Sequence, residues 1–357
     1  MSALEAHFGG PDRPAGRLRD LLAERVESVP TGGAIDWVTY YFRDRGLAEA
    51  LARAGRRGVR VEVTLDGWPR TPHANDAVIA FLRKELGDGL RVVAHPMDAT
   101  PCGKLVRPRL HEKLYCFSHP EPVAFIGSFN PSGDVPEEQP ELLRAIGDQN
   151  RGHNLLVELR DTALHGRLVE HARGLHRQHH GPFDRFRSNA NRSLYGAGVA
   201  VHFLPRVRRD PVIELLGRCG AHHHVRMAAS HLSGPTSLRI LRGMLRRGTR
   251  LEILAEATER RVPPHIETQL RAAGAVIRRF THPEGLPMHA KFTLIDGEGE
   301  RWSVFGSFNW TEPSRRFNRE IAAISGDGEL FDALAARWKV IQAQLGAGPG
   351  ALTSGAP

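Results

Sequence analysis

The chain has 357 residues, 41% hydrophobic and 25% charged, and is long enough for one large domain or two ordinary ones. Its 49 Lys and Arg against 40 Asp and Glu give a net charge of +9. That charge fits an inert Arg-rich surface as well as affinity for nucleic acid, acidic lipid or a phosphorylated substrate. Cys102, Cys116 and Cys219 form no CxxC pair, which argues against a disulfide framework or a cysteine zinc site.

The N-terminus has no apolar signal-peptide core, and no stretch reaches the roughly 18 consecutive apolar residues of a membrane span. We therefore expect a cytoplasmic protein that can dock peripherally at the inner membrane surface.

Apolar and amphipathic segments alternate along both halves of the chain. In the first half we expect a strand at 34–42, a helix at 47–58, a strand at 59–67, a helix at 76–86 and a strand at 90–95. The second half repeats this order with a strand at 225–230, a helix at 237–248, a strand at 249–257, a helix at 264–273 and a strand at 275–280. The first helix of each half ends in Arg-Arg-Gly, which is typical of a helix C-terminus.

A common motif follows these segments in each half. LHEKLYCFSHPEPVAFIGSFN begins at Leu110, and MHAKFTLIDGEGERWSVFGSFN begins at Met288. Each copy reads His-x-Lys, strand, turn, strand and Gly-Ser-Phe-Asn. The matched spacing indicates an internal duplication.

The duplication and the alternation together predict an α/β fold of two similar halves packed about a pseudo-twofold axis, with the active site between them. We expect the halves to cover residues 1–190 and 191–345. A polar, basic junction at 178–197 joins them as a linker or a loop bordering the site. The Gly/Pro/Ala-rich tail at 346–357 is expected to be disordered.

The motif residues suggest one pocket for a tetrahedral oxyanion. On a strand, residues two apart share a face, so each histidine should lie beside its lysine and each GSFN serine beside its asparagine. The residues concerned are His111, Lys113, Ser128, Asn130, His289, Lys291, Ser307 and Asn309. The competing interpretation, core histidines and simple turns, is disfavoured because two copies occur in register. No cofactor is expected, and no carboxylate cluster for a metal ion is visible.

These motifs resemble those of the phospholipase D superfamily, whose signature is His-x-Lys, four residues, Asp, and a following Gly-Ser/Gly-x-Asn. The second copy is complete, with Asp296 and the downstream Asn318 and Glu320. The first copy has Ser118 in place of the aspartate, and downstream we align Asn154 with Asn318 and Leu156 with Glu320. The resemblance extends from about Ala34 to about Gln344.

The resemblance implies a two-step reaction through a covalent phosphohistidine. One histidine attacks phosphorus, and the other protonates the leaving oxygen and then activates water or an alcohol. The lysines and asparagines would stabilise the non-bridging oxygens, with Ser128 and Ser307 assisting. Trp310 is either a substrate-facing aromatic or a core residue.

The order of the two histidines depends on the carboxylates. If Asp296 or Glu320 lies against His289, that histidine holds a proton better and His111 is the nucleophile, as is usual in the family. Against this, a carboxylate can also orient a nucleophilic imidazole. A loop acid, Glu137, Glu138 or Glu141, could replace the one missing from the first copy.

The expected function is therefore a phospholipase D-like phosphodiesterase that hydrolyses or transfers phosphodiesters, preferably of phospholipids at a membrane surface. The alternatives are a metal-independent nuclease acting on DNA or RNA, and a catalytically weakened binding protein for phosphate or nucleic acid. The sequence leaves the head group, hydrolysis versus transfer, and the oligomeric state open.

Overall fold

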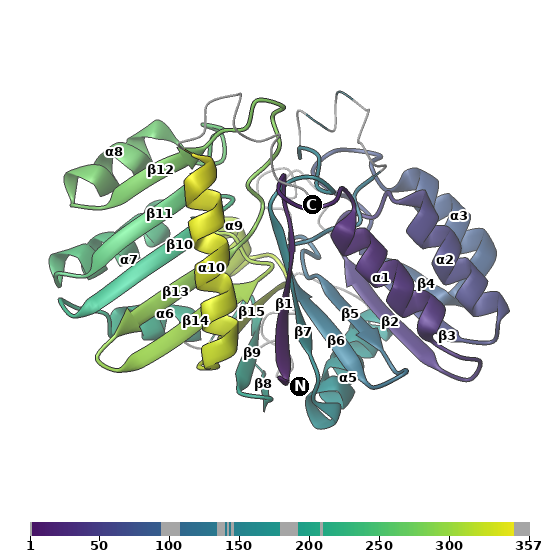
Figure 1. Cartoon of the computed structure of the whole chain (residues 1–357). Helices are drawn as coiled ribbons and strands as arrows, with labels where there is room; N and C mark the ends of the chain where they lie inside the picture. The colour runs from purple at the N-terminus through teal and green to yellow at the C-terminus, as the bar shows by residue number, and fades with distance from the viewer. Residues whose placement is uncertain are drawn as a thin grey trace, which may run out of the picture.

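The protein is an α/β structure with two sheets, one in each half, as the sequence predicts (Figure 1). The computed structural model describes residues 2–93, 108–133, 140, 143, 146–178, 192–207 and 210–345. The predicted disordered tail and the acids Glu137, Glu138 and Glu141 lie outside these residues.

The first half contains one sheet and the helices that flank it. Its elements are β1 (Leu4–Gly9), α1 (Arg17–Ser28), β2 (Ala34–Thr39), α2 (Arg45–Arg56), β3 (Arg60–Asp66), α3 (Asp76–Leu86), the 3-10 turn η1 (Gly87–Gly89), β4 (Leu90–Val93), β5 (Leu114–Phe117), β6 (Val123–Gly127), β7 (Asn154–Leu159) and α5 (Thr162–Arg177).

The second half repeats this order of elements. They are β8 (Ser193–Gly196), β9 (Val199–Leu204), α6 (Pro211–Gly217), β10 (His223–Ala229), α7 (Pro235–Arg246), β11 (Arg250–Glu256), α8 (Pro264–Ala272), β12 (Val276–Phe280), β13 (Phe292–Gly297), β14 (Glu300–Gly306), α9 (Glu312–Arg316), β15 (Glu320–Ser325) and α10 (Gly328–Gln344). Strand β8 lies within the junction that the sequence analysis treats as a linker.

The two sheets have matching strand orders. The first runs β4-β3-β2-β5-β6-β7-β1, and the second runs β12-β11-β10-β13-β14-β15-β9 with β8 added at its edge. Strands β2 to β4 and β10 to β12 are parallel, and the others pair antiparallel. The repeat therefore begins at β1 and β9, upstream of the segments in which the sequence similarity is visible.

Local sequence explains the helix boundaries. Asp44 caps α2 by accepting a hydrogen bond from the Leu47 amide, as expected for an aspartate at a helix start. The predicted Arg-Arg-Gly endings contain Gly58 and Gly248, with φ of 87° and 86°. Because a left-handed glycine cannot continue a helix, α2 and α7 end two residues earlier than the sequence analysis predicts.

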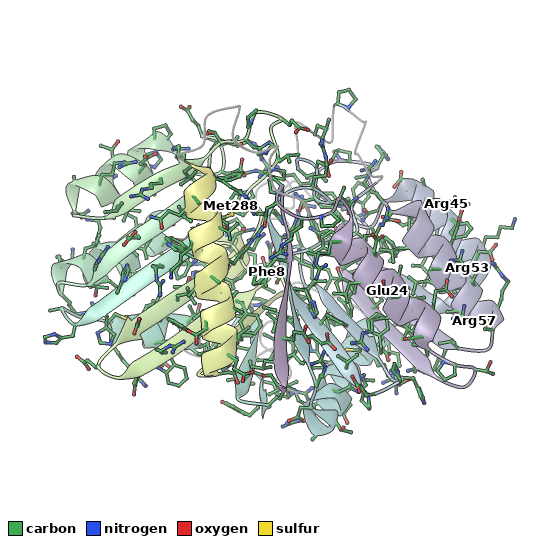
Figure 2. All side chains as sticks on the ribbon, viewed as in Figure 1. Phe8, Glu24, Arg45, Arg53, Arg57 and Met288 are labelled. Carbon is green, nitrogen blue, oxygen red and sulfur yellow. The ribbon has the colours of Figure 1, made fainter. Side chains whose placement is uncertain are left out.

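A shared hydrophobic core joins the halves. It includes Leu114 and Leu155 from the first half and Met288 and Phe305 from the second, all buried. Figure 2 shows Met288 near the centre, where the halves meet. Outer cores lie under α1–α3 in one half and under α6–α8 in the other. The halves are thus one packed body, and a site between them has rigid walls.

Part of the basic excess is neutralised on the outer helices. Figure 2 shows Arg45, Arg53 and Arg57 on or beside α2, away from the seam. Arg53 and Arg57 both donate to the Glu27 carboxylate, at 2.7 and 2.8 Å. Exposed pairs of this kind contribute little to stability, and the single Glu27 carboxylate balances only one of the two guanidinium charges.

Candidate active site between the two halves

Each His-x-Lys segment pairs with the opposite half of the molecule. The His111 amide donates to the Arg319 carbonyl, and the His289 amide donates to the His153 carbonyl, both at 2.9 Å. The His-x-Lys residues therefore lie just before β5 and β13. The sequence analysis expected them within strands. The exchange is reciprocal, so the pseudo-twofold axis passes between the two motifs.

The glycine of each GSFN motif is required by a close backbone approach. A Cβ on Gly127 would collide with the Leu155 carbonyl oxygen, and one on Gly306 would collide with that of Ile321. Gly306 also has φ of 143°. Each glycine thus lets its strand end against the next one, which directs the following side chains into the seam.

Each motif histidine is held by a side chain of the other half. The Glu320 carboxylate accepts from His111 Nδ1 at 2.7 Å, and the Asn154 amide oxygen accepts from His289 Nδ1 at 2.9 Å. Both histidines are 8% exposed. Because Nδ1 is engaged as a donor, Nε2 is the nitrogen available to a bound molecule.

This arrangement corrects two expectations. Glu320 contacts His111 and not His289. In addition, Asn154 rather than Leu156 corresponds to Glu320, since Ser128 Oγ donates to Asn154 and Ser307 Oγ donates to Glu320. The alignment of the sequence analysis was two residues out of register, because it matched an asparagine with an asparagine.

Burial and the neighbouring ammonium groups disfavour additional positive charge at the site. Burial lowers the pKa of His111 to about 4, an effect that Glu320 opposes and Lys113 reinforces. The pKa of Lys113 falls to about 7 for the same primary reason, burial. Burial and then Lys291 hold the pKa of His289 well below its usual range. Both imidazoles are therefore favoured in their neutral form.

The two lysines lie behind the histidines. Lys113 Nζ donates to the carbonyl oxygen of His111 at 2.8 Å, and Lys291 Nζ donates to that of His289 at 2.7 Å. Both lysines are buried. Their charges thus reach the space in front of the histidines through a medium of low dielectric constant, where screening is weak.

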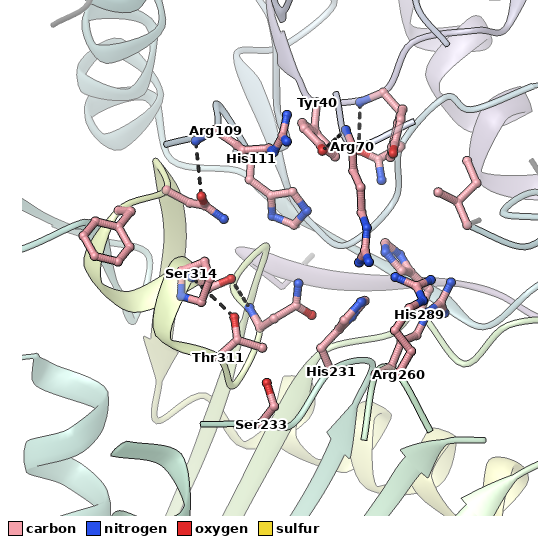
Figure 3. A pocket seen from close by; sticks show the side chains of 18 of the residues that line it. Tyr40, Arg70, Arg109, His111, His231, Ser233, Arg260, His289, Thr311 and Ser314 are labelled. Carbon is pink, nitrogen blue, oxygen red and sulfur yellow. Dashed lines mark hydrogen bonds between the residues drawn. The ribbon is translucent and has the colours of Figure 1, made fainter. Parts of the chain in front are cut away.

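A cavity of about 630 Å³ opens in front of the histidines (Figure 3). Its described lining residues are Tyr40, Tyr41, Arg70, Arg109, His111, Asn130, Ile146, Gln149, His231, Ser233, Arg260, Arg261, His289, Asn309, Thr311, Pro313, Ser314, Phe317 and Asn318. No carboxylate or thiol occurs among them. The cavity is therefore a cationic and polar site that suits an anion.

Some predicted site residues reach the cavity and others do not. Asn130 and Asn309 line it, as expected for anion-stabilising amides. Ser128 and Ser307 donate instead to the groups that hold the histidines, so their predicted contact with substrate is not supported. Trp310 is 4% exposed and packs on Phe308, which supports the core interpretation.

The signature aspartate lies away from the cavity. Asp296 is exposed near the end of β13, seven residues after His289, which is roughly 20 Å of extended chain. Its counterpart Ser118 accepts a hydrogen bond from the Ala34 amide at the matching end of β5. Asp296 is not among the described residues that line the cavity, so the structure does not support its predicted catalytic role, and Ser118 occupies the same position in the first half.

Sequence reasoning missed the arginines and His231. Asp66 and Glu256 each accept a hydrogen bond from the backbone amide of the residue that precedes a motif histidine. Arg70 and Arg260 each lie four residues after one of these carboxylates. These bonds are Leu110 N to Asp66 and Met288 N to Glu256, both 2.8 Å. Comparing the ends of the repeated strands β3 and β11 would have revealed both arginines.

The comparisons with known proteins agree with this geometry. The model of a family described as "Cardiolipin synthase, PLD-like domain" matches residues 31–158 and again 212–340. The chain belongs to the phospholipase D superfamily. Each match lies within one structural repeat and includes its motif histidine. No curated protein sequence matches the chain.

Two solved structures share the phospholipase D-like fold over nearly the whole chain. Phosphatidylserine synthase from Haemophilus influenzae has a TM-score of 0.61 and 13% identity, over 96% of this chain and 86% of that one. Polyphosphate kinase from Porphyromonas gingivalis has a TM-score of 0.61 and 14% identity, over 95% of this chain. The present chain spans only 50% of the kinase.

Two further features bear on the partners of this phospholipase D-like chain. Among its described helices, none combines the length and apolarity needed to cross a bilayer. Glu5, His7 and Glu158 lie close enough together to hold a metal ion, but Arg25 and Arg160 also pair with Glu158. That cluster lies on β1 and β7, and none of its residues lines the cavity.

Proposed function

We propose that the chain cleaves or transfers phosphodiesters through a covalent phosphohistidine on His111. The observation that carries the proposal is the pair of imidazoles at one anion-binding cavity, each with Nδ1 held by the other half. Such an arrangement leaves two Nε2 atoms for one phosphorus, one as nucleophile and one as acid.

In the first step, His111 Nε2 forms a bond to phosphorus and the bond to the leaving oxygen breaks. His289, protonated once the anion is bound, gives its Nε2 proton to that oxygen. In the second step, neutral His289 takes a proton from water or an alcohol, whose oxygen attacks phosphorus as the P–N bond breaks. Water gives a phosphomonoester, and an alcohol gives a new diester.

The contact between Glu320 and His111 also favours His111 as the nucleophile. The reason differs from the one in the sequence analysis, which depended on a carboxylate holding a proton on His289. Attack turns His111 into a phosphorylated imidazolium while His289 becomes neutral. A carboxylate beside His111 therefore stabilises the charge that develops in the transition state. A carboxylate beside the acid would stabilise the state before reaction and weaken the acid.

We favour phospholipid phosphodiesters as the substrate class. The family description refers to cardiolipin synthase, and the fold matches a phosphatidylserine synthase over most of both chains. In addition, Trp68 is 53% exposed in the loop that carries Arg70 to the cavity mouth. An exposed tryptophan beside basic residues suits the interface of an anionic membrane.

The arginines favour nucleic acid as the second candidate substrate, since a cationic groove also binds a sugar-phosphate backbone. Turnover of phosphatidylglycerol and phosphatidylcholine vesicles and of single-stranded DNA, all in EDTA, separates the candidates. We expect cleavage of lipid that is abolished in His111→Ala. Cleavage of DNA alone would replace the lipid assignment, and rescue only by added Mg²⁺ or Zn²⁺ would overturn the mechanism.

A further inference from the structure

Three arginines meet on one side of the cavity. Arg70 comes from the first half, and Arg260 and Arg261 come from the second. Figure 3 shows the Arg70 side chain extending toward His289 and Arg260. Burial and then the Arg70 charge lower the pKa of Arg260. The Arg261 charge also acts on His289.

The other side of the cavity is different. His111 has Glu320 and the two motif lysines as its principal charged neighbours. Arg109 lines this side, where its amide donates to Asn318 Oδ1 at 3.2 Å. The cationic excess is therefore concentrated around His289 and is not spread evenly about the pseudo-twofold axis.

The number of cations exceeds what one phosphodiester requires. A diester brings one negative charge, and two buried lysines already lie behind the histidines that would contact it. Three guanidinium groups line the cavity in addition. Arg261 Nη1 lies 3.4 Å from the Glu256 carboxylate, which offsets part of this charge, but no carboxylate is among the described residues that line the cavity itself. The remaining excess of cations is stabilised when further negative charge is bound.

The position of Arg70 is also fixed by the fold. Its amide donates to the Tyr40 hydroxyl at 2.6 Å, and the next amide, of Thr71, donates to the Tyr41 hydroxyl at 3.1 Å. Both tyrosines line the cavity themselves. These two bonds hold the backbone of the loop against the cavity wall, so the Arg70 side chain extends into the cavity from a defined position.

We propose that Arg70, Arg260 and Arg261 form a second anion subsite, which binds another phosphoryl group of the substrate next to the scissile one. Planar guanidinium groups suit this task because they donate two hydrogen bonds to phosphoryl oxygens. The subsite rests on the proposed function only for its orientation. With His289 as the acid, the second phosphoryl group belongs to the leaving group.

Calorimetric titration with orthophosphate and with pyrophosphate, both in EDTA, tests the subsite without turnover. Wild type should bind pyrophosphate about tenfold or more tightly than orthophosphate, since one charge-assisted contact is worth about that factor. Arg70→Gln should remove most of this preference. Arg260→Gln serves as a second variant if Arg70→Gln fails to fold.

Two matched substitutions remove the same charge elsewhere. Arg242→Gln lies on the exposed face of α7 and should leave the preference unchanged. Arg109→Gln lies on the His111 side and should lower the affinities for both anions by the same factor. Equal wild-type affinities for the two anions, or a preference retained in both Arg70→Gln and Arg260→Gln, would overturn the subsite.

Titration with tripolyphosphate, the dinucleotide pTpT and glycerophosphoglycerol phosphate then identifies the source of the second phosphoryl group. The source is the compound whose affinity falls most in Arg70→Gln, and equal losses support recognition of the phosphoryl group alone. An inactive protein that still prefers pyrophosphate in an Arg70-dependent manner would refute the phosphodiesterase and retain the subsite. Active protein without the preference would do the reverse.

Discussion

The two halves of the site are alike in backbone and different in charge. His111 is held by the Glu320 carboxylate, whereas His289 is held by the Asn154 amide. The serines that support these two groups are equivalent, as are the lysines behind the histidines. Duplication thus supplied two copies of one imidazole site, and a single exchange of acid for amide allows them different roles.

Substitution of either histidine should have the largest effect on activity and should distinguish the two halves of the site. His111→Ala should be inactive toward bis(p-nitrophenyl) phosphate. His289→Ala should still complete the first step, because p-nitrophenolate needs little protonation, and should then accumulate phosphohistidine at His111. With ordinary alcohol leaving groups, loss of the acid should cost about 10²–10⁴ in rate.

Mass spectrometry at alkaline pH locates the acid-labile adduct in each variant. Thermal melts close to wild type show that the loss is catalytic and not structural. An adduct on His289 in the His111→Ala protein would reverse the assignment and make the amide-held histidine the nucleophile.

Substitution of Glu320 or Asn154, the side chains that hold the two histidines, should have the next largest effect on kcat. Glu320→Gln removes the charge that stabilises phosphorylated His111 and disturbs its tautomer, so kcat should fall on the order of 10²–10⁴-fold. Asn154→Asp places a carboxylate beside His289 instead. That change should alter kcat by about tenfold or less, since a carboxylate raises the pKa of the acid, which favours its protonated form but makes it a weaker proton donor.

Asn154→Asp should also lower Tm. Asn154 Nδ2 donates to the Gln149 carbonyl oxygen at 2.9 Å, and the variant's carboxylate would face that oxygen without a proton to donate. Steady-state kinetics of both variants on one substrate give the comparison. A larger kcat loss in Asn154→Asp than in Glu320→Gln would contradict the roles assigned to the two histidines.

The pH dependence of kcat/KM should show the smallest effect. Lys113, whose pKa burial lowers to about 7, loses its charge as pH rises through that value. Attraction for the anionic substrate weakens accordingly, so kcat/KM should decline above about pH 7. His111, with a pKa of about 4, is neutral and nucleophilic throughout this range.

Lys113→Arg retains the charge at higher pH and should move the alkaline limb upward, whereas an exposed charge change such as Arg242→Gln should leave it in place. A wild-type profile that stays flat to pH 9 would contradict a titrating lysine behind the nucleophile.

Local patterns in the sequence were sufficient to predict the repeated fold. Strand and helix segments follow from hydrophobic periodicity, and α3 spans the predicted residues. The recurrence of His-x-Lys and GSFN in each half predicted that both histidines reach one cavity. Both cues are local in sequence, because each depends on side chains within one strand, helix or turn.

The partner of each histidine was decided only by the tertiary structure. Glu320 and His111 are 209 residues apart, and Asn154 and His289 are 135 apart, so no local spacing encodes either contact. The sequence analysis considered Glu320 only as a partner for the histidine of its own half. Each motif backbone instead pairs with the opposite half, which brings each carboxylate or amide to the histidine of the other repeat. The arginine subsite has the same origin, because its members come from loops that meet only when the two halves pack.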